Sequence, residues 1–175
     1  MYVRFAIPEL TQIDALRCEA LALPLFSDER PLRGALGLLD WRLCGFLSGL
    51  VERGKVLGEP LETVLVPGRP KLTMDKLFML GLGPSGGFDE RALRQGLDHI
   101  LDTLARARVR STALVLPGRN GSRPIAPARA MEAFVACALH RDDHDELILL
   151  EPPEAQREME PVMERERRRA RAELG

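Results

Sequence analysis

The sequence predicts a single α/β domain in which a mixed sheet of about six strands carries helices on both faces. Short apolar runs bounded by turn residues recur along the chain, and stretches with apolar residues at helical spacing separate them. The clearest run, Lys76–Leu80, ends in a glycine-rich turn and is followed by a helix with Asp89 as its N-cap. A buried strand, a glycine turn and a helix start in this order are typical of α/β proteins.

The remaining strands follow from the same pattern. Residues 2–7 alternate and stop at Pro8, which indicates an edge strand. Only about nine residues separate the predicted strands at 62–67 and 77–81; this is too short for a crossover helix, so we expect them to be antiparallel. The other strands are expected near residues 20–25, 112–116 and 146–150. The strand at 112–116 should be parallel to the one at 77–81, because a helix connects them.

Helices are predicted between the strands. The first long helix should start at a cap provided by Ser27 or Asp28 and end at Gly54, with Trp41 off its buried stripe. Further helices are expected over residues 89–108 and 127–140.

A charged helix closes the chain. We therefore divide the protein into an α/β domain over residues 1–152 and a C-terminal helix over residues 153–175. Pro161 lies inside the helical pattern and should kink or restart it. We expect an apolar patch on one face of this helix to be an interaction element, packed on its own domain or on another subunit. The patch consists of Met159, Val162 and Met163.

Composition limits the class of protein. A formal net charge of −1 gives no general attraction to nucleic acid or to an anionic membrane, and 6 Phe, 1 Tyr and 1 Trp leave little aromatic surface for stacking bases. No apolar run approaches about 18 residues and the N-terminus lacks the plan of a signal peptide, so we expect a cytoplasmic protein. Cys18, Cys44 and Cys137 lie far apart in apolar sequence, which indicates buried, reduced thiols.

The glycine-rich turn is the candidate binding site. Its glycines let a ligand or another backbone come close, and the following helix presents free N–H groups at its start. Arg119 should reach the same end of the sheet and add a positive charge. The positions proposed to bind an anion are Gly81, Gly83, Ser85, Gly86, Gly87, Arg119 and Ser122.

A turn that binds nothing is the alternative for the same residues. Asp89 favours this alternative, because a capping carboxylate competes for the same N–H groups and repels an anion. Ser85 and Arg119 are both expected at the surface, where substitution should cost little stability.

The order of these segments resembles the N-terminal domain of the leucine aminopeptidase family, which has a macro-domain-like fold. The resemblance rests on Leu21-Ala22-Leu23-Pro24, on Glu62-Thr63-Val64-Leu65-Val66-Pro67 and on the turn Gly81-Leu82-Gly83. It runs from about Asp14 to the end, through the helix at residues 131–139, and implies a single macro-like domain of three layers.

The resemblance also implies what this chain lacks. In that family a C-terminal domain carries the two-zinc site and a catalytic Arg, and this chain stops after the helix that would lead into that domain. We therefore expect no catalytic residue, no metal site and no peptidase activity, since a two-metal site needs several converging carboxylates. His140 and His144 have a spacing found in some metal sites, but a solvated turn is expected there.

Two classes of function remain. The first is a non-catalytic binding or assembly module that contacts itself or another protein. The second is a binding protein or hydrolase for a nucleotide, ADP-ribose or a similar small phosphate-bearing ligand at the Gly81–Gly87 corner. Hydrolytic macro domains usually carry Asn-rich sequence after the second strand, and here this place is Leu23-Pro24-Leu25-Phe26-Ser27, which argues against hydrolysis. No cofactor is predicted.

Overall fold

The computed structural model describes residues 1–120 and 124–173, and its centre is one six-stranded sheet. The strands lie in the order β1-β6-β5-β2-β4-β3, and only β3 is antiparallel to its neighbour. They are β1 (Tyr2–Ala6), β2 (Ala20–Leu25), β3 (Thr63–Pro67), β4 (Lys76–Gly81), β5 (Ser111–Leu114) and β6 (Glu146–Leu150). The predicted mixed sheet and the antiparallel pairing of β3 with β4 are confirmed.

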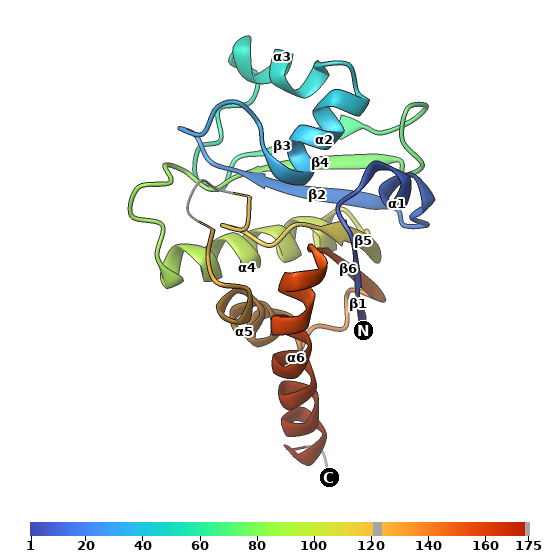
Figure 1. Ribbon diagram of the computed structural model, residues 1–175, viewed down its shortest axis with the longest axis vertical. Coiled ribbons are helices and arrows are strands. Elements are labelled where there is room, and N and C mark those ends of the chain that lie inside the picture. Colours follow the sequence, from blue (N-terminus) through green and yellow to red (C-terminus); the bar gives the residue numbers. More distant parts are fainter. Residues whose placement is uncertain (121–123, 174–175) are drawn as a thin grey trace.

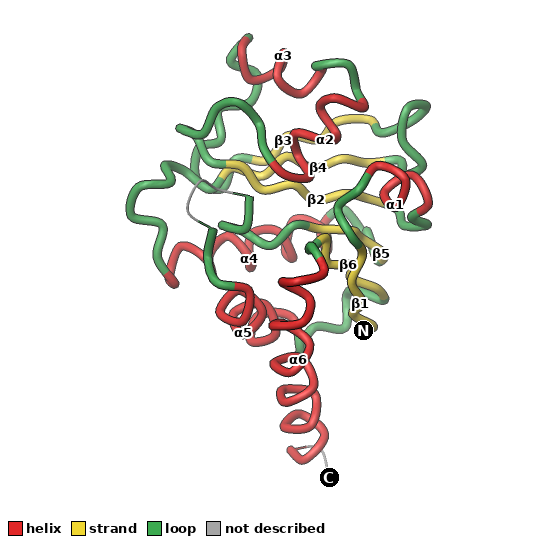
Figure 2. The backbone as a smooth tube through the Cα atoms, viewed as in Figure 1, coloured by secondary structure: helices red, strands yellow, loops and turns green. Residues whose placement is uncertain are grey.

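Helices cover both faces of the sheet, as predicted (Figure 1). One face carries α1 (Leu10–Ala15), α2 (Gly34–Arg42) and α3 (Phe46–Glu52). The other carries α4 (Glu90–Arg106), α5 (Pro127–Ala138) and α6 (Pro153–Glu173). Two separate apolar clusters, one on each face, form the core. The backbone tube shows the C-terminal half of α6 projecting beyond the body of the domain (Figure 2).

The sheet opens between β2 and β5 at the carboxyl ends of these strands. Every residue of β2 is buried, as expected for a strand with helices on both faces. Its pairing with β5 ends at Ala22, whereas its pairing with β4 continues to Leu25. Pro24 lacks an N–H group and lies beyond the last β5 partner, where no ladder bond on that side is needed. The loops after β2 and β5 separate at this point.

The position of β2 corrects one expectation. Arg119 was expected to reach the glycine turn from the strand next to β4. Instead β2 lies between β4 and β5, although all three strands are parallel.

The predicted helix from Ser27 or Asp28 to Gly54 is wrong in two respects. It begins only at Gly34, because Arg33 is still extended and makes no side-chain cap. It is also broken into α2 and α3, because Cys44 and Gly45 have positive φ angles of 59° and 76°. The short helix α1 was not predicted.

Helix α4 agrees with the prediction. The Asp89 Oδ1 atom accepts the Ala92 N–H group at 2.8 Å, which confirms the N-cap. The apolar stripe of α4 is buried and consists of Leu93, Leu97, Ile100, Leu101 and Leu104.

The C-terminal helix packs on its own domain. Helix α6 continues through Pro161 without restarting. Met159, Val162 and Met163, expected as an interaction element, are buried in the apolar cluster that α4 and α5 share. None of the described helices is long and apolar enough to cross a membrane alone. Helices α2 and α3 reach that length and apolar content only when taken together, and the chain bends by 107° between them.

Candidate functional site at the carboxyl ends of the strands

The glycine turn after β4 is packed against the chain's own backbone. The Gly81 N–H group donates to the Glu62 carbonyl at 2.8 Å, and the Gly83 N–H group donates to the Gly58 carbonyl at 2.8 Å. A Cβ atom on Gly81 would lie 1.9 Å from the Glu59 carbonyl oxygen. Gly81 is therefore required for the close approach of the segment before β3. This glycine was expected to admit either a ligand or another backbone, and here it admits a backbone.

Carboxylates already occupy donors of this turn. Asp28, from the loop after β2, accepts the Ser85 N–H group at 2.9 Å and the Ser85 hydroxyl at 3.0 Å. The bond from the Ser85 N–H group is the main reason that the pKa of Asp28 lies below its ordinary value. With Asp89 on the Ala92 N–H group, two negative charges lie where an anion was expected to bind.

Gly86 and Gly87 form the exposed tip of the turn. Apart from the chain neighbours, no heavy atom of the described residues lies within 4 Å of a Cβ atom built on either glycine. Gly87 has a φ angle of +83°, a conformation that L side chains rarely adopt. Of the four proposed glycines, these two have the most open surroundings.

Arg119 is held by another carboxylate. Its Nε atom donates to Glu151 Oε1 at 3.0 Å, its Nη2 atom to Glu151 Oε2 at 2.9 Å, and its Nη1 atom to the Ile125 carbonyl at 2.6 Å. The two side chains are only 11% and 2% exposed, so the expectation that Arg119 is a surface residue is wrong. Burial raises the pKa of Glu151, and the guanidinium opposes this shift. Ser122 lies outside the described residues.

A crevice between the loops after β2 and β5 contains two polar atoms that find no partner among residues 1–120 and 124–173. These are Oε1 of Glu29 and Nδ2 of Asn120, and both residues line this crevice. A Cβ atom on Gly34 would lie 2.3 Å from Asn120 Oδ1, so glycine at this position makes room for the amide. Neither Glu29 nor Asn120 was a predicted site residue, because each belongs to a polar loop without a motif.

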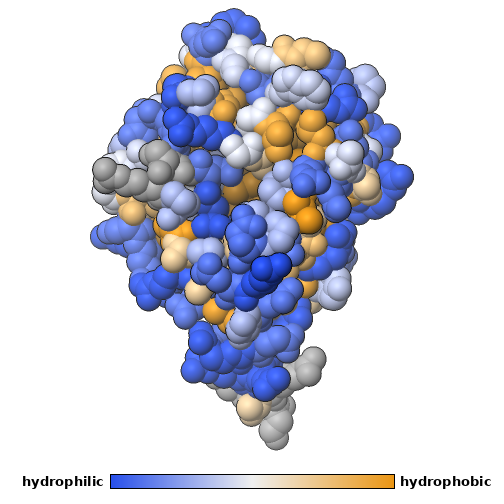
Figure 3. All heavy atoms as spheres, viewed as in Figure 1, coloured by the Kyte–Doolittle hydropathy of each residue, from blue (hydrophilic) through white to orange (hydrophobic). Residues whose placement is uncertain are grey.

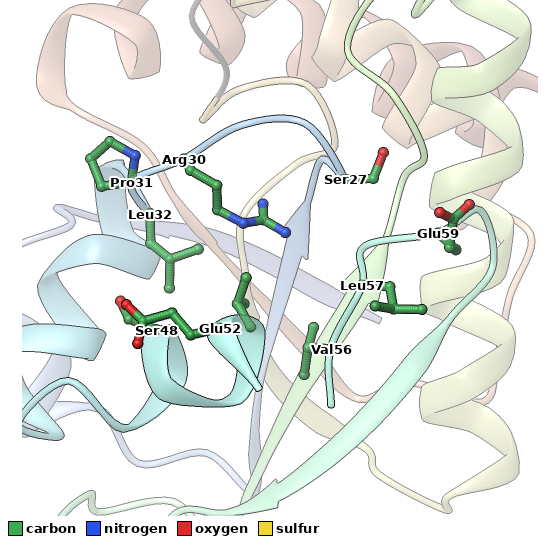
Figure 4. A pocket seen from close by; sticks show the side chains of 10 residues that line it. Ser27, Arg30, Pro31, Leu32, Ser48, Glu52, Val56, Leu57 and Glu59 are labelled. Carbon is green, nitrogen blue, oxygen red and sulfur yellow. The ribbon is translucent and has the colours of Figure 1, made fainter. Parts of the chain in front are cut away.

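The sequence also did not predict a cavity of about 780 Å³ between the loop after β2, α3 and the segment before β3. Figure 4 shows the Arg30 guanidinium pointing into this cavity, with Leu57 and Glu59 on its far side. Arg30 Nη1 donates to the Phe26 and Glu29 carbonyls at 2.9 and 2.8 Å. The cavity wall is thus mixed in charge and partly apolar.

The histidines of the predicted turn do not converge. His144 is buried, whereas His140 is exposed. Within residues 1–120 and 124–173, no group of three or more metal-ligating side chains comes together. On α4, His99 Nε2 lies 2.9 Å from the Thr63 hydroxyl, and burial lowers the pKa of His99.

Exposed apolar side chains gather near the β3 edge of the sheet. Leu57, Leu61 and Leu65 are 51%, 59% and 55% exposed. Trp41 and Phe46, on α2 and α3, are also exposed. In Figure 3 apolar groups appear mainly over the half of this face that holds α2 and α3, and the projecting part of α6 is hydrophilic.

The fold of the chain is macrodomain-like. The Trypanosoma brucei macrodomain superposes with a TM-score of 0.70 and 15% identity, covering 93% of this chain and 67% of that one. The same macrodomain in complex with ADP gives a TM-score of 0.69 at 16% identity, covering 92% of this chain and 67% of that one. A tomato leucine aminopeptidase mutant gives 0.61 at 13% identity, covering 93% of this chain and 35% of that one. At these identities the likeness is one of fold.

The chain belongs to the cytosol aminopeptidase family. Residues 22–145 match the model of the N-terminal domain of that family. A probable cytosol aminopeptidase of Thermosynechococcus vestitus is 31% identical over 126 residues, which cover 71% of this chain and 25% of that protein. One from Synechocystis is 29% identical over 125 residues, with the same coverage. The chain thus spans about a quarter of the length of these relatives, and the resemblance expected from the sequence is confirmed.

Proposed function

We propose that the chain is a non-catalytic binding or assembly module of the cytosol aminopeptidase family and that it acts through protein contacts. The exposure of Leu57, Leu61 and Leu65 beside β3 carries this proposal. Leucines that are each more than half exposed along one short segment leave apolar area in water, and covering this area with a partner gains free energy.

The contacts of the glycine corner support the same choice. Gly81 and Gly83 bond to the segment before β3, Ser85 bonds to Asp28, and Arg119 bonds to Glu151. A phosphate would have to displace a carboxylate from Ser85 or Arg119 or bind beside it, which costs electrostatic free energy.

The proposal is tested by measuring association directly. Sedimentation velocity over a range of concentrations reports whether the chain binds itself. Mixing it with a Thermosynechococcus cytosol aminopeptidase that lacks its own N-terminal domain reports whether it binds another protein of the family. We expect at least one association, and Leu61→Ser together with Leu57→Ser should weaken it while the melting temperature stays the same. A monomer that binds neither partner would refute the proposal.

The non-catalytic part of the proposal has a separate test. Leucine chromogenic substrates with added zinc or manganese should release product only at the background rate. Turnover that follows the protein peak through purification would contradict it.

A small-ligand function is the second candidate, because Glu29 Oε1 and Asn120 Nδ2 have no partner in the described part of the chain at the carboxyl ends of β2 and β5. A macrodomain of similar fold has been solved with ADP. Under this alternative, ADP or ADP-ribose would give heat in a calorimetric titration, and Ser85→Glu would abolish it by adding a negative charge. No heat at millimolar ligand would exclude it. We further infer a cytoplasmic location, which the description of the relatives as cytosol aminopeptidases supports.

A further inference from the structure

The two edges of the sheet differ in how they are covered. At the β1 edge, α6 reaches over the strand, and Arg167 Nη2 donates to the Val3 carbonyl at 3.0 Å. At the β3 edge, Thr63, Leu65 and Pro67 are exposed, and the part of the chain that the structure describes supplies no second strand. An uncovered edge strand is a template for pairing with another strand.

The hydrogen bonds to β4 determine which backbone groups of β3 point outward. The Gly81 N–H group donates to the Glu62 carbonyl, and the Gly68 N–H group donates to the Asp75 carbonyl. Residues of an antiparallel strand alternate between facing the partner and facing away, so the even-numbered residues from 62 to 68 face β4. The N–H and carbonyl groups of Thr63 and Leu65, and the carbonyl of Pro67, therefore face away from the sheet.

We propose that β3 pairs antiparallel with β3 of a second copy of this chain, around a two-fold axis at Leu65, so that two sheets become one. This inference rests on the proposed function and names its partner and surface. A two-fold axis makes each contact occur twice, which is how a five-residue edge strand gives a stable isologous contact.

The register follows from the outward groups. With the axis at Leu65, the two Leu65 residues exchange a reciprocal pair of N–H to carbonyl bonds. The Thr63 N–H group of each copy then meets the Pro67 carbonyl of the other, and Pro67, which has no N–H group, only has to accept. An axis at Pro67 would place two such residues opposite each other, and an axis at Thr63 would leave half of the strand unpaired. The Leu65 side chains also meet on one face of the joined sheet.

Charge at the two ends of β3 favours the same arrangement. The segment before β3 carries the exposed Glu59. The segment after it carries the exposed Lys71 and also Arg69, which is paired with Asp75. Antiparallel pairing around Leu65 brings the acidic end of one copy beside the basic end of the other. Parallel pairing would instead place like charges together.

The first experiment is a cross-link at the axis. In a hydrogen-bonded antiparallel pair the Cα atoms lie about 5.5 Å apart, which is within the range for a disulfide. In a Cys44→Ser background, Leu65→Cys should give a covalent dimer under mild oxidation. Tyr2→Cys is the matched control, because Tyr2 is similarly exposed (59%) but lies on the other edge of the sheet. Absence of a Leu65→Cys dimer, or equal dimer from both variants, overturns the inference.

The second experiment removes the outward donor. Leu65→Pro deletes an N–H group that β4 does not use, so the melting temperature should change little while the dimer Kd rises by at least about a hundredfold. Lys71→Glu should weaken the dimer by about tenfold, and adding Glu59→Lys should restore it. If wild type dimerises but these variants leave Kd unchanged, the inference fails and the proposed function stands. If wild type binds only another protein, the inference again fails and the proposed function again stands. If it binds nothing, both fail.

Discussion

Arg119 and Glu151 form a buried ion pair that connects the loops after β5 and β6. Removing one partner of such a pair leaves an uncompensated charge, so we expect Arg119→Ala to lower the free energy of unfolding by about 3–5 kcal/mol. Urea denaturation of the variant and of wild type measures this difference. The double variant with Glu151→Gln should recover part of the loss, and a single variant as stable as wild type would contradict the prediction.

The same variant should show a defined pH dependence. Burial already raises the pKa of Glu151 above its ordinary value of 4.5, and loss of the guanidinium removes what opposes this shift. The folded variant then binds a proton more tightly than the unfolded chain, so its stability should fall as pH rises from that ordinary value through the raised folded pKa. Denaturation at about pH 5 and about pH 7 tests whether the free energy of unfolding of the variant falls as pH rises. The free energy of unfolding of wild type should decrease less between these two pH values.

The three cysteines should differ in reactivity, because only Cys44 is exposed. This corrects the expectation of three buried thiols. Burial raises the pKa of Cys18, and burial with Asp98 nearby raises the pKa of Cys137 to about 11, so both stay protonated near neutral pH. Iodoacetamide labelling followed by peptide mass mapping should modify Cys44 first. Equal labelling of all three in the folded protein would contradict this.

At the scale of the element, Gly81 and Gly86 of the glycine turn serve as a test position and its matched control. A methyl group on Gly81 would collide with the Glu59 carbonyl, whereas one on Gly86 meets nothing within 4 Å. We expect Gly81→Ala to cost about 1–3 kcal/mol or more, and Gly86→Ala to stay within about 0.5 kcal/mol of wild type. Thermal unfolding of both variants decides this, and equal melting temperatures would show that the backbone contact is not needed.

Local signals were sufficient to predict most of the elements. The strands were predictable from apolar runs, and α4 from Asp89 and its leucine stripe, because cap and stripe are local properties. The break between α2 and α3 was not predictable, since the apolar stripe of Leu39, Leu43 and Leu47 continues across it. The position of β2 between β4 and β5 depends on long-range packing, which periodicity does not encode.

The candidate site was less predictable than the fold, because its partners lie far apart in sequence. Asp28 was predicted as a possible helix cap, yet it binds Ser85, 57 residues away. Arg119 was predicted to meet an anion, and the carboxylate that it meets is Glu151, 32 residues away. Ser85 and Arg119 could thus be singled out from the sequence, whereas the carboxylates that bind them required the tertiary structure.

At the scale of the whole molecule, the sheet has one covered edge and one open edge. Helix α6 lies at the β1 edge and contributes Arg167 to it, while β3 presents its outward groups and exposed leucines at the opposite end of the strand order. Contacts through β3 therefore leave the packing of α6 undisturbed. Truncation can separate the contribution of α6 to stability from association through β3.

Truncation of α6 should act on stability rather than on association. Met159, Val162 and Met163 are buried against the cluster of α4 and α5, so removing residues 153–175 exposes core and should abolish cooperative unfolding or lower the melting temperature sharply. Removing only residues 168–175 keeps these contacts and Arg167, and should change the melting temperature by no more than a few degrees, about 2–4 °C. Sedimentation of this shorter truncation should give the wild-type association constant. A weaker association would instead show that the projecting end of α6 contacts the partner.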